Sequence, residues 1–372
     1  MRLRHPNGST VHLAYCTNVH PAEDLAGVLA QLDRFAVPVR EHLNVATLGL
    51  GLWLAAPVAA ELGADRELRS RLRRELTARG LETVTFNGFP YEAFHAPVVK
   101  HRVYYPDWTD RRRLKYTLDL ALVLADLLPD DAARGSISTL PFAWRSPWSE
   151  EHLKAAHVLL AELAKRIGRL HREIRIALEP EPGCVVETTA QAVEALSGVD
   201  SERIGVCLDL AHLACAWEDP YEAVARLRGA GIPIVKSQVS AALEVADPQA
   251  AQQVLAAYAE PRFLHQTRSA AGDAFDDLPE ALASGAAGPW RTHFHAPLHA
   301  AALPPLDTST KVLREGLAAL MSGDVCDHLE VETYTWDVLP PSARPADDAG
   351  LARGIAAELA FARDELAALG VS

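Results

Sequence analysis

The sequence predicts an α/β fold in which eight parallel strands close into a (β/α)8 barrel. Apolar strand-like segments alternate with amphipathic helical segments along almost the whole chain. The strand-like segments are too apolar to leave one face in water, which is typical of a parallel sheet covered by helices. The first of them is followed by TNVHPAED, whereas an open doubly wound sheet usually has a glycine-rich phosphate turn there. Eight strand–helix units are the number that a closed barrel requires.

Each element is expected from its own pattern of apolar residues and its flanking turn residues. Strands are expected at residues 11–16, 44–50, 82–87, 135–140, 174–181, 204–209, 233–239 and 328–334. Helices are expected at residues 22–35, 57–79, 110–128, 150–171, 187–197, 219–230, 247–259, 308–322 and 347–369.

Two segments interrupt this regular alternation. Residues 87–109 form a long connection rich in aromatic residues, and residues 261–305 contain two further strand-like pieces, FLHQ and THFHAP. Both insertions follow strands, so they should lie at the C-terminal face of the barrel, where they are candidate lids and pocket walls. We expect one barrel domain spanning residues 1–372, with the helix at 347–369 packed outside it.

Composition limits the classes of function. The chain has 372 residues, with 36 basic and 49 acidic side chains and a net charge of −13. Nucleic-acid binding is disfavoured, because phosphate contacts need clustered Lys and Arg; the one short run, residues 111–113, should open a solvated helix. The most apolar stretch, residues 45–60, is short for a membrane span and contains Pro57, so we expect a buried strand leading into a helix and no membrane insertion. Five cysteines without a CxxC pair favour a reducing cytoplasmic location.

Paired carboxylates on two strands are the strongest functional signal. Glu179 and Glu181 are two residues apart on one expected strand, and Glu330 and Glu332 are two apart on the last. Alternation along a strand directs the two members of each pair to the same face. Glu at alternate positions also occurs on exposed strands, but both of these strands are central in the alternation. We therefore expect at least one Glu of each pair to be functional.

Other polar residues follow strands at the same end. Asp209 and His212 end the strand at 204–209, where Asp209 is either a functional carboxylate or the N-cap of the next helix. His293 and His295 should share one face of a strand, near His265 in sequence. Further candidates for contacts with metal or substrate are His20, Asn87, Lys236 and Gln238. Carboxylates and imidazoles at strand ends are the ingredients of an oxygen and nitrogen metal site.

Several of these motifs resemble one family. LEPEP at 178–182, LDLAH at 208–212 and VET at 331–333 resemble the xylose isomerase-like TIM barrels, which include sugar isomerases, ketose 3-epimerases, inosose dehydratases and endonuclease IV. Over nearly the whole chain, YCTNVHP (15–21), FNGFPYEAFH (86–95), VYYPDW (103–108), SISTLPF (136–142), LHQ (264–266), HFHAP (293–297) and LEVETYTW (329–336) are similar to the EboE metabolite-traffic proteins.

The resemblance implies a role for individual residues. The family's metal-binding Glu on strand five falls on Glu179, the Asp on strand six on Asp209, and the last Glu on Glu332. The substrate-contacting His falls on His212, and the seventh-strand ligand, commonly His, falls on Gln238. An amide oxygen is a poorer zinc ligand than imidazole, so one of the nearby histidines is expected to supply the missing nitrogen, or the metal binds weakly.

These observations together predict a metal-dependent isomerase or epimerase that acts on a sugar, sugar phosphate or cyclitol through an enediolate. The expected catalytic residues are Glu179 and Glu332; the expected ligands of a divalent ion (Mn, Mg, Co or Zn) are Glu179, Asp209, Gln238, Glu332, His293 and His295. The expected substrate-binding residues are His20, Asn87, Glu181, His212, Lys236, His265 and Glu330. Two alternatives stay open: a non-catalytic metabolite-binding or trafficking barrel, and a metal-dependent phosphoesterase of the endonuclease IV type. Whether the chain forms a homodimer is also left open.

Overall fold

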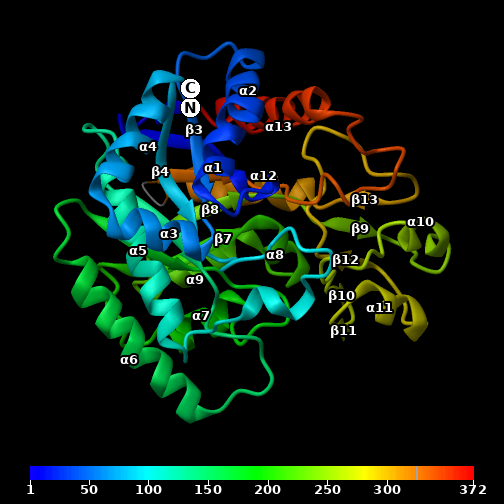
Figure 1. Ribbon diagram of the computed structural model, residues 1–372. Helices are drawn as coiled ribbons and strands as arrows, with labels where there is room; N and C mark the ends of the chain where they lie inside the picture. The colour runs from blue at the N-terminus through cyan, green and yellow to red at the C-terminus, as the bar shows by residue number, and fades with distance from the viewer. Residues whose placement is uncertain (324–325) are drawn as a thin grey trace.

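Eight parallel strands close into a ring in the computed structural model, which describes residues 1–323 and 326–372 (Figure 1). The ring strands are β2 (Thr10–Cys16), β3 (Leu48–Trp53), β4 (Leu81–Asn87), β5 (Gly135–Thr139), β6 (Ile174–Leu178), β7 (Ile204–Asp209), β8 (Ile234–Val239) and β14 (His328–Val331). The strand β2 pairs in parallel with both β3 and β14, which closes the ring. The predicted (β/α)8 barrel is therefore confirmed. A short strand that was not predicted, β1 (Arg2–Arg4), pairs antiparallel with β2.

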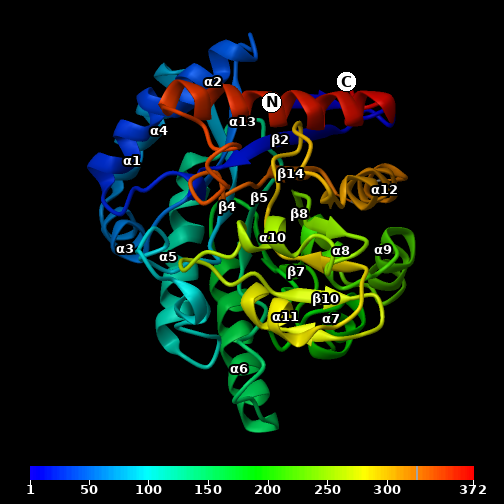
Figure 2. The same cartoon turned by 90° about the vertical axis from the view of Figure 1, so that its right-hand side faces the viewer.

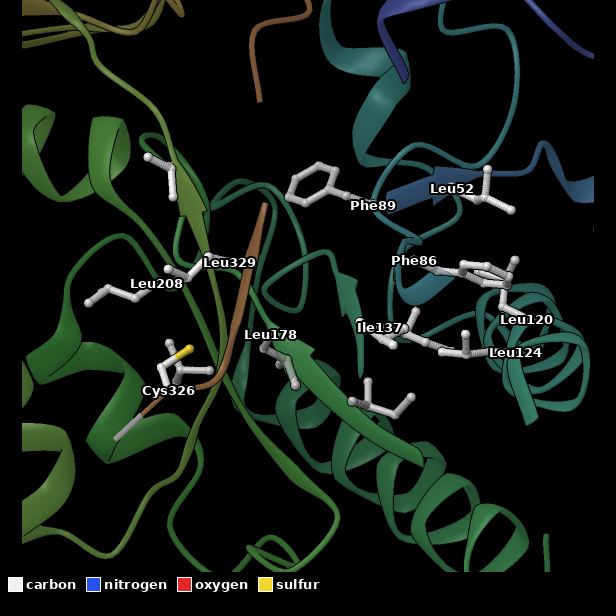
Figure 3. Close-up of a cluster of buried hydrophobic side chains, with 14 of the residues drawn as sticks. Leu52, Phe86, Phe89, Leu120, Leu124, Ile137, Leu178, Leu208, Cys326 and Leu329 are labelled. Atoms are coloured by element: carbon white, nitrogen blue, oxygen red, sulfur yellow. The ribbon is translucent and has the colours of Figure 1, made fainter. Parts of the chain in front are cut away.

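Helices cover the outside of the ring, as the sequence pattern requires. Their bounds are α1 (Leu25–Gln31), α2 (Val37–His42), α3 (Ala56–Ala64), α4 (Arg66–Ala78), α5 (Arg111–Leu127), α6 (Glu150–Ile167), α7 (Thr189–Ala195), α8 (Leu210–Cys215), α9 (Pro220–Gly229), α12 (Thr310–Met321) and α13 (Asp348–Ala368). Figure 3 shows how they pack: Leu120 and Leu124, one turn apart on α5, point toward Phe86 of β4 and Ile137 of β5.

Several of the predicted elements need correction. The expected helix at 22–35 continues through a π-helical turn, η2 (Leu32–Ala36), into α2. The expected helix at 57–79 divides at Asp65, whose side chain caps α4 by accepting hydrogen bonds from the backbone of Glu67 and Leu68. The expected strand at 44–50 begins only at Leu48, because the chain first turns through Asn44, which has a φ of 52°. The expected passage from a buried strand into a helix is confirmed in β3 and α3.

A second, five-stranded antiparallel sheet lies beside the barrel on one side (Figures 1 and 2). It consists of β9 (Leu243–Val245), β10 (Thr267–Ser269), β11 (Ala274–Phe275), β12 (Trp290–Thr292) and β13 (Asp307–Thr308), with α10 (Gln252–Ala256) and α11 (Leu278–Ser284). The expected helix at 247–259 is thus only the short α10, and it belongs to this sheet. FLHQ is not a strand, and most of THFHAP follows β12, so the segment containing His293 and His295 is irregular backbone.

The two ends of the chain meet on one side of the barrel, where α13 crosses it (Figure 2). Backbone hydrogen bonds of 2.7 and 3.1 Å join Arg4 and Ser372 in both directions. Among the residues that the structure describes, no helix is long and apolar enough to cross a membrane.

Polar side chains fill the interior of the ring, where barrels usually have Val, Ile and Leu. Ser136 of β5 bonds to His328 of β14 across the ring, with 2.8 Å between Oγ and Nδ1. Lys236 and Glu330 form an ion pair, and both side chains are completely buried. Gly51 of β3 makes room for this pair, since a Cβ there would lie 1.3 Å from Glu330 Oε1. The polar interior leads directly to the polar ends of the strands.

Candidate metal site and substrate pocket

One pocket at the carboxyl ends of the strands gathers most of the predicted residues. The polar side chains that line it are Asn18, Asn87, Lys100, Glu179, Glu181, His212, His293, His295 and Glu332. The other lining residues are Phe89, Pro90, Phe94, Val99, Val103, Tyr104, Phe263, Leu264 and Tyr334. Polar and apolar side chains thus face the same space, as in sites that bind small molecules.

Three carboxylates converge beneath this space from β6, β7 and β14. Glu179, Asp209 and Glu332 are 3%, 1% and 4% exposed. Glu332 Oε1 accepts hydrogen bonds from the side-chain amides of Asn18 (2.7 Å) and Asn87 (2.8 Å). Glu179 Oε2 and Asp209 Oδ2 are buried and have no hydrogen-bond partner among the described residues. Buried carboxylate oxygens without donors cost several kcal/mol unless a proton or a cation satisfies them.

Asp209 is an N-cap, one of the two roles that the sequence allowed. Its Oδ1 accepts from the backbone N–H of His212 at 2.8 Å and so caps α8. Ser240 Oγ donates to the same oxygen at 2.8 Å. These bonds fix the carboxylate and leave Oδ2 directed elsewhere, so capping does not exclude a metal-binding role.

Three histidines direct ring nitrogens at one another above the carboxylates. His212 Nδ1 lies 2.9 Å from the carbonyl of Pro180, and His295 Nδ1 lies 2.7 Å from that of Glu332. Carbonyl partners place the proton on Nδ1 and leave a lone pair on Nε2. The Nε2 atoms of His212 and His293 are 3.0 Å apart, and those of His293 and His295 are 3.2 Å apart. Lone pairs that face each other at this distance repel unless a proton or a cation lies between them.

The pKa values of the pocket's carboxyl and imidazole groups also favour a bound cation. Burial, and then the charges of Glu332 and Asp209, raise the pKa of Glu179 well above its ordinary value. Burial and Asp209 likewise raise the pKa of Glu332. Burial lowers the pKa of His295 to about 4 and that of His293 well below its ordinary value. His293 and His295 are therefore neutral, which is the form of imidazole that binds metals, and Glu179 and Glu332 favour the protonated form unless a cation compensates their charge.

These residues fit a divalent cation. Three sets each bring their ligand atoms within 4.8 Å of one another: Glu179, Asp209 and His212; Asp209, His295 and Glu332; and His212, His293 and His295. Mixed carboxylate and imidazole ligands suit zinc, manganese or cobalt, whereas magnesium prefers oxygen alone. Gln238 is completely buried next to Asp209 in the sheet, and both of its amide atoms lack partners among the described residues.

Four of the predicted substrate-binding residues are not among those that line the pocket, and their contact with a substrate stays a prediction. Lys236 and Glu330 are enclosed in the barrel and paired with each other. His20 stacks on Phe35 with 4.0 Å between ring centroids. His265 bonds to the carbonyl of His293 and to Glu260, so it holds the histidine segment in place.

Asn87, Glu181 and His212 do line the pocket. The amide of Asn87 is engaged with Glu332, and Glu181 Oε1 accepts from the hydroxyl of Tyr104 at 2.8 Å. His212 Nε2 lies 3.5 Å from Glu181 Oε2 and stands among the candidate metal ligands.

The sequence predicted two insertions as pocket walls, but it missed the residue that anchors them. Residues 88–110, residues 260–266 and Tyr334 form the roof of the pocket, and backbone N–H groups of Val99 and Lys100 both donate to the carbonyl of Arg262 at 2.8 Å. Arg113, expected on a solvated helix face, is instead completely buried. Its guanidinium donates to the carbonyls of Pro106, Gly88 and Phe89 at 2.8–3.0 Å, which anchors the roof to α5.

A closed (β/α)8 barrel with an acid- and histidine-lined pocket at the carboxyl ends of its strands defines the class of protein. Residues 49–254, more than half of the chain, match the family model described as xylose isomerase-like TIM barrel, and the chain belongs to that family. A search of curated protein sequences returned no match.

Solved structures resemble the whole molecule at low sequence identity. The D-allulose 3-epimerase from Methylomonas sp. in complex with D-allulose is 13% identical, with a TM-score of 0.54 over 98% of this chain and 100% of that one. The D-psicose 3-epimerase with D-tagatose from Clostridium cellulolyticum H10 is 13% identical, with a TM-score of 0.53 over 95% and 99%. The IOLI protein with a zinc atom is 13% identical, with a TM-score of 0.52 over 96% and 97%. At these identities the likeness shows the fold alone.

Proposed function

We propose that this protein is a metal-dependent isomerase or epimerase acting on a sugar, a sugar phosphate or a cyclitol. The observation that carries the proposal is the pair Glu179 and Glu332, two buried carboxylates that line one pocket together with a set of metal-type ligands. The named activities of two of the similar structures, both ketose 3-epimerases, support it.

Glu179, Asp209, Glu332 and His295 would hold a divalent ion, with Gln238 beside them. His295 would replace the histidine that the family usually has on its seventh strand. A divalent ion held there supplies Lewis-acid polarisation of a substrate carbonyl.

The protein's own residues would move the proton. Glu179 or Glu332, as a carboxylate, would take a proton from the carbon next to the carbonyl, and the other Glu, in its protonated form, would give a proton to the resulting enediolate. Asn18 and Asn87 orient Glu332, because both of their amides bond to its Oε1. Glu181, fixed by the hydroxyl of Tyr104, faces the same pocket and would bind a substrate hydroxyl. The aromatic roof would exclude water from the enediolate.

Incorporation of solvent deuterium tests this proposal. The purified, metal-loaded protein is incubated in D2O with pentoses, hexoses, their phosphates and inososes, and label is sought at the carbon next to the carbonyl. Proton abstraction labels that carbon even when net conversion is slow. A folded protein with stoichiometric metal that labels none of these compounds would overturn the proposal. The similarity to the EboE metabolite-traffic proteins then favours a pocket that binds a metabolite without converting it.

The histidine cluster favours a second candidate, a metal-dependent phosphoesterase. Multi-metal hydrolytic sites need several imidazoles. The Nε2 atom of His293 lies 3.0 Å from that of His212 and 3.2 Å from that of His295. Bound zinc of two or more atoms per chain, together with hydrolysis of bis(p-nitrophenyl) phosphate, would support this candidate. Zinc or manganese at one atom per chain without hydrolysis would exclude it.

A further inference from the structure

The pocket has two chemically different halves. The lower half carries carboxylates, imidazoles and the amides of Asn18 and Asn87. The upper half is the roof, and it is almost entirely apolar. Its members are Phe89, Pro90, Phe94, Val99, Val103, Tyr104, Phe263, Leu264 and Tyr334.

The pocket has no cation free to bind an anion. Of the described residues that line it, Lys100 is the only Lys or Arg. Its ammonium group already pairs with Asp277 Oδ2 at 2.5 Å and bonds to the carbonyl of Glu260 at 3.3 Å. Phosphate groups in proteins are recognised by Arg, Lys or free backbone N–H groups at helix ends. A phosphorylated substrate would lack the first two of these partners here.

The charge of the lower half also opposes an anion. Glu179, Glu181, Asp209 and Glu332 all lie at or directly below the pocket. One divalent ion offsets two of the four carboxylate charges and leaves the floor formally negative. A neutral substrate meets no such repulsion, and its hydroxyls match the acceptors that are present.

The apolar roof contains a cluster of aromatic rings. Phe94, Phe263 and Tyr334 form this cluster, with ring centroids 5.0–5.4 Å apart. Val98 and Tyr105, the chain neighbours of the lining residues Val99 and Tyr104, are 47% and 53% exposed. They are two of the five large hydrophobic side chains that are exposed on the described part of the molecule. Exposed apolar groups beside a pocket commonly mark a binding site.

We propose that the substrate is a neutral, unphosphorylated molecule with a hydroxylated head and an apolar tail. The inference rests on the proposed function for the chemistry of the head and on the roof for the tail. The head lies on the carboxylates and imidazoles, and the tail packs under the aromatic cluster.

Binding of simple glycosides tests this without requiring turnover. Metal-loaded protein is titrated calorimetrically with methyl and hexyl β-D-glucopyranoside, which share a head and differ in the tail, and with glucose and glucose 6-phosphate. Each fully buried methylene strengthens binding about fourfold, so the hexyl glycoside is expected to bind at least about tenfold more tightly than the methyl glycoside. Glucose 6-phosphate is expected to bind no more tightly than glucose.

Two variants assign the effect to the roof. Phe263→Ala should remove most of the preference for the hexyl glycoside, whereas Tyr221→Ala, an exposed aromatic on α9, should keep it. Val103 is half-buried in the roof, so Val103→Arg adds a cation there and should make glucose 6-phosphate bind more tightly than glucose. Val103→Met has a long side chain without the charge and should not.

The outcomes separate the two proposals. Any one of three results overturns the inference. The unaltered protein binds both glycosides equally, it binds glucose 6-phosphate more tightly than glucose, or it binds none of the four probes. Protein that prefers the hexyl glycoside but labels no carbonyl compound with deuterium overturns the proposed function and leaves the neutral, amphiphilic ligand in place.

Discussion

The orientation of Glu332 is defined by two amides, which hold one of its oxygens and leave the other for chemistry. Glu332→Gln keeps the size of the side chain and removes its charge. General acid–base catalysis contributes about 10²–10⁴-fold, so we expect the rate of deuterium incorporation to fall by at least that factor. The circular dichroism spectrum should be unchanged.

The matched control for this variant is Glu315→Gln, a half-exposed carboxylate on α12 that pairs with Lys311. Its labelling rate should equal that of the unaltered protein. If Glu332→Gln labels substrate at the normal rate, Glu332 is not the acid or base.

Glu358 on α13 gives a prediction about the dependence of stability on pH. Burial raises its pKa to about 7, and its carboxylate accepts from Thr333 Oγ1 and from the backbone of Leu298. Below about pH 4.5 the group is protonated in both the folded and the unfolded chain. As the pH rises toward 7, only the unfolded chain loses the proton, so this group lowers the free energy of unfolding by about 3 kcal/mol across that window.

Glu358→Gln keeps the acceptor oxygen and cannot ionise. The difference in free energy of unfolding between this variant and the unaltered protein should therefore grow between pH 4.5 and 7, in favour of the variant. Denaturant titrations at several pH values measure it. A difference that does not change with pH would show that Glu358 is not buried as a neutral acid.

At this scale the sequence identified the residues that alternate on strands. Glu179, Asp209 and Glu332 lie where strand geometry and the end of a strand place them. The sequence could not tell which of Glu330 and Glu332 lines the pocket. Alternation along the strand directs both side chains to the barrel interior but does not say how far each lies from the pocket. Glu330 lies deeper in the barrel because it forms an ion pair with Lys236 of the neighbouring strand β8.

At the scale of elements, the strand β3 shows how one glycine makes a polar interior compatible with a closed ring. A Cβ at position 51 would lie 1.3 Å from Glu330 Oε1 and 2.3 Å from its Cδ. Gly51→Ala must therefore displace Glu330 from Lys236, and breaking a buried pair costs about 3–5 kcal/mol. We expect the free energy of unfolding to fall by about that amount in chemical denaturation.

The control for position 51 is Gly229→Ala at the end of α9, where an added Cβ meets nothing within 4 Å. Its effect on the free energy of unfolding should be near zero or slightly positive, because alanine favours helix. Equal effects of the two substitutions would mean that the Lys236 and Glu330 pair does not depend on the space beside Gly51.

Elements with a regular period were predicted, and those fixed by distant contacts were not. The strands and long helices of the barrel follow their apolar pattern closely; α5 was expected at 110–128 and runs from Arg111 to Leu127. The strands of the second sheet have only two or three residues each, too short for a period to be recognised. The histidine segment after β12 is positioned by Gln266 and Glu332 rather than by local pattern.

At the scale of the whole molecule, three parts of the chain meet over the same point. The ring supplies the carboxylates, the connection after β4 supplies much of the roof, and the segment that follows β12 supplies His293 and His295. A cation at that point would bind only to the folded chain, because the unfolded chain does not bring these groups together. The stability of the whole protein should therefore depend on the ion.

Thermal unfolding in a chelator and with added Mn²⁺ or Zn²⁺ measures this dependence. A ligand at 100 times its dissociation constant stabilises the folded state by about 2.7 kcal/mol, so the unfolding temperature should rise by several degrees.

The variant Asp209→Asn should differ from the unaltered protein in opposite directions with chelator and with added metal. It keeps the oxygen that caps α8 but removes one of the facing negative charges, so it should be more stable than the unaltered protein in chelator. It should gain little from the ion, since a ligand charge is lost. Asp348→Asn, an exposed carboxylate paired with Arg34, should gain as much as the unaltered protein. Equal gains for all three proteins would place any bound ion outside the pocket and remove the support for a metal-dependent reaction there.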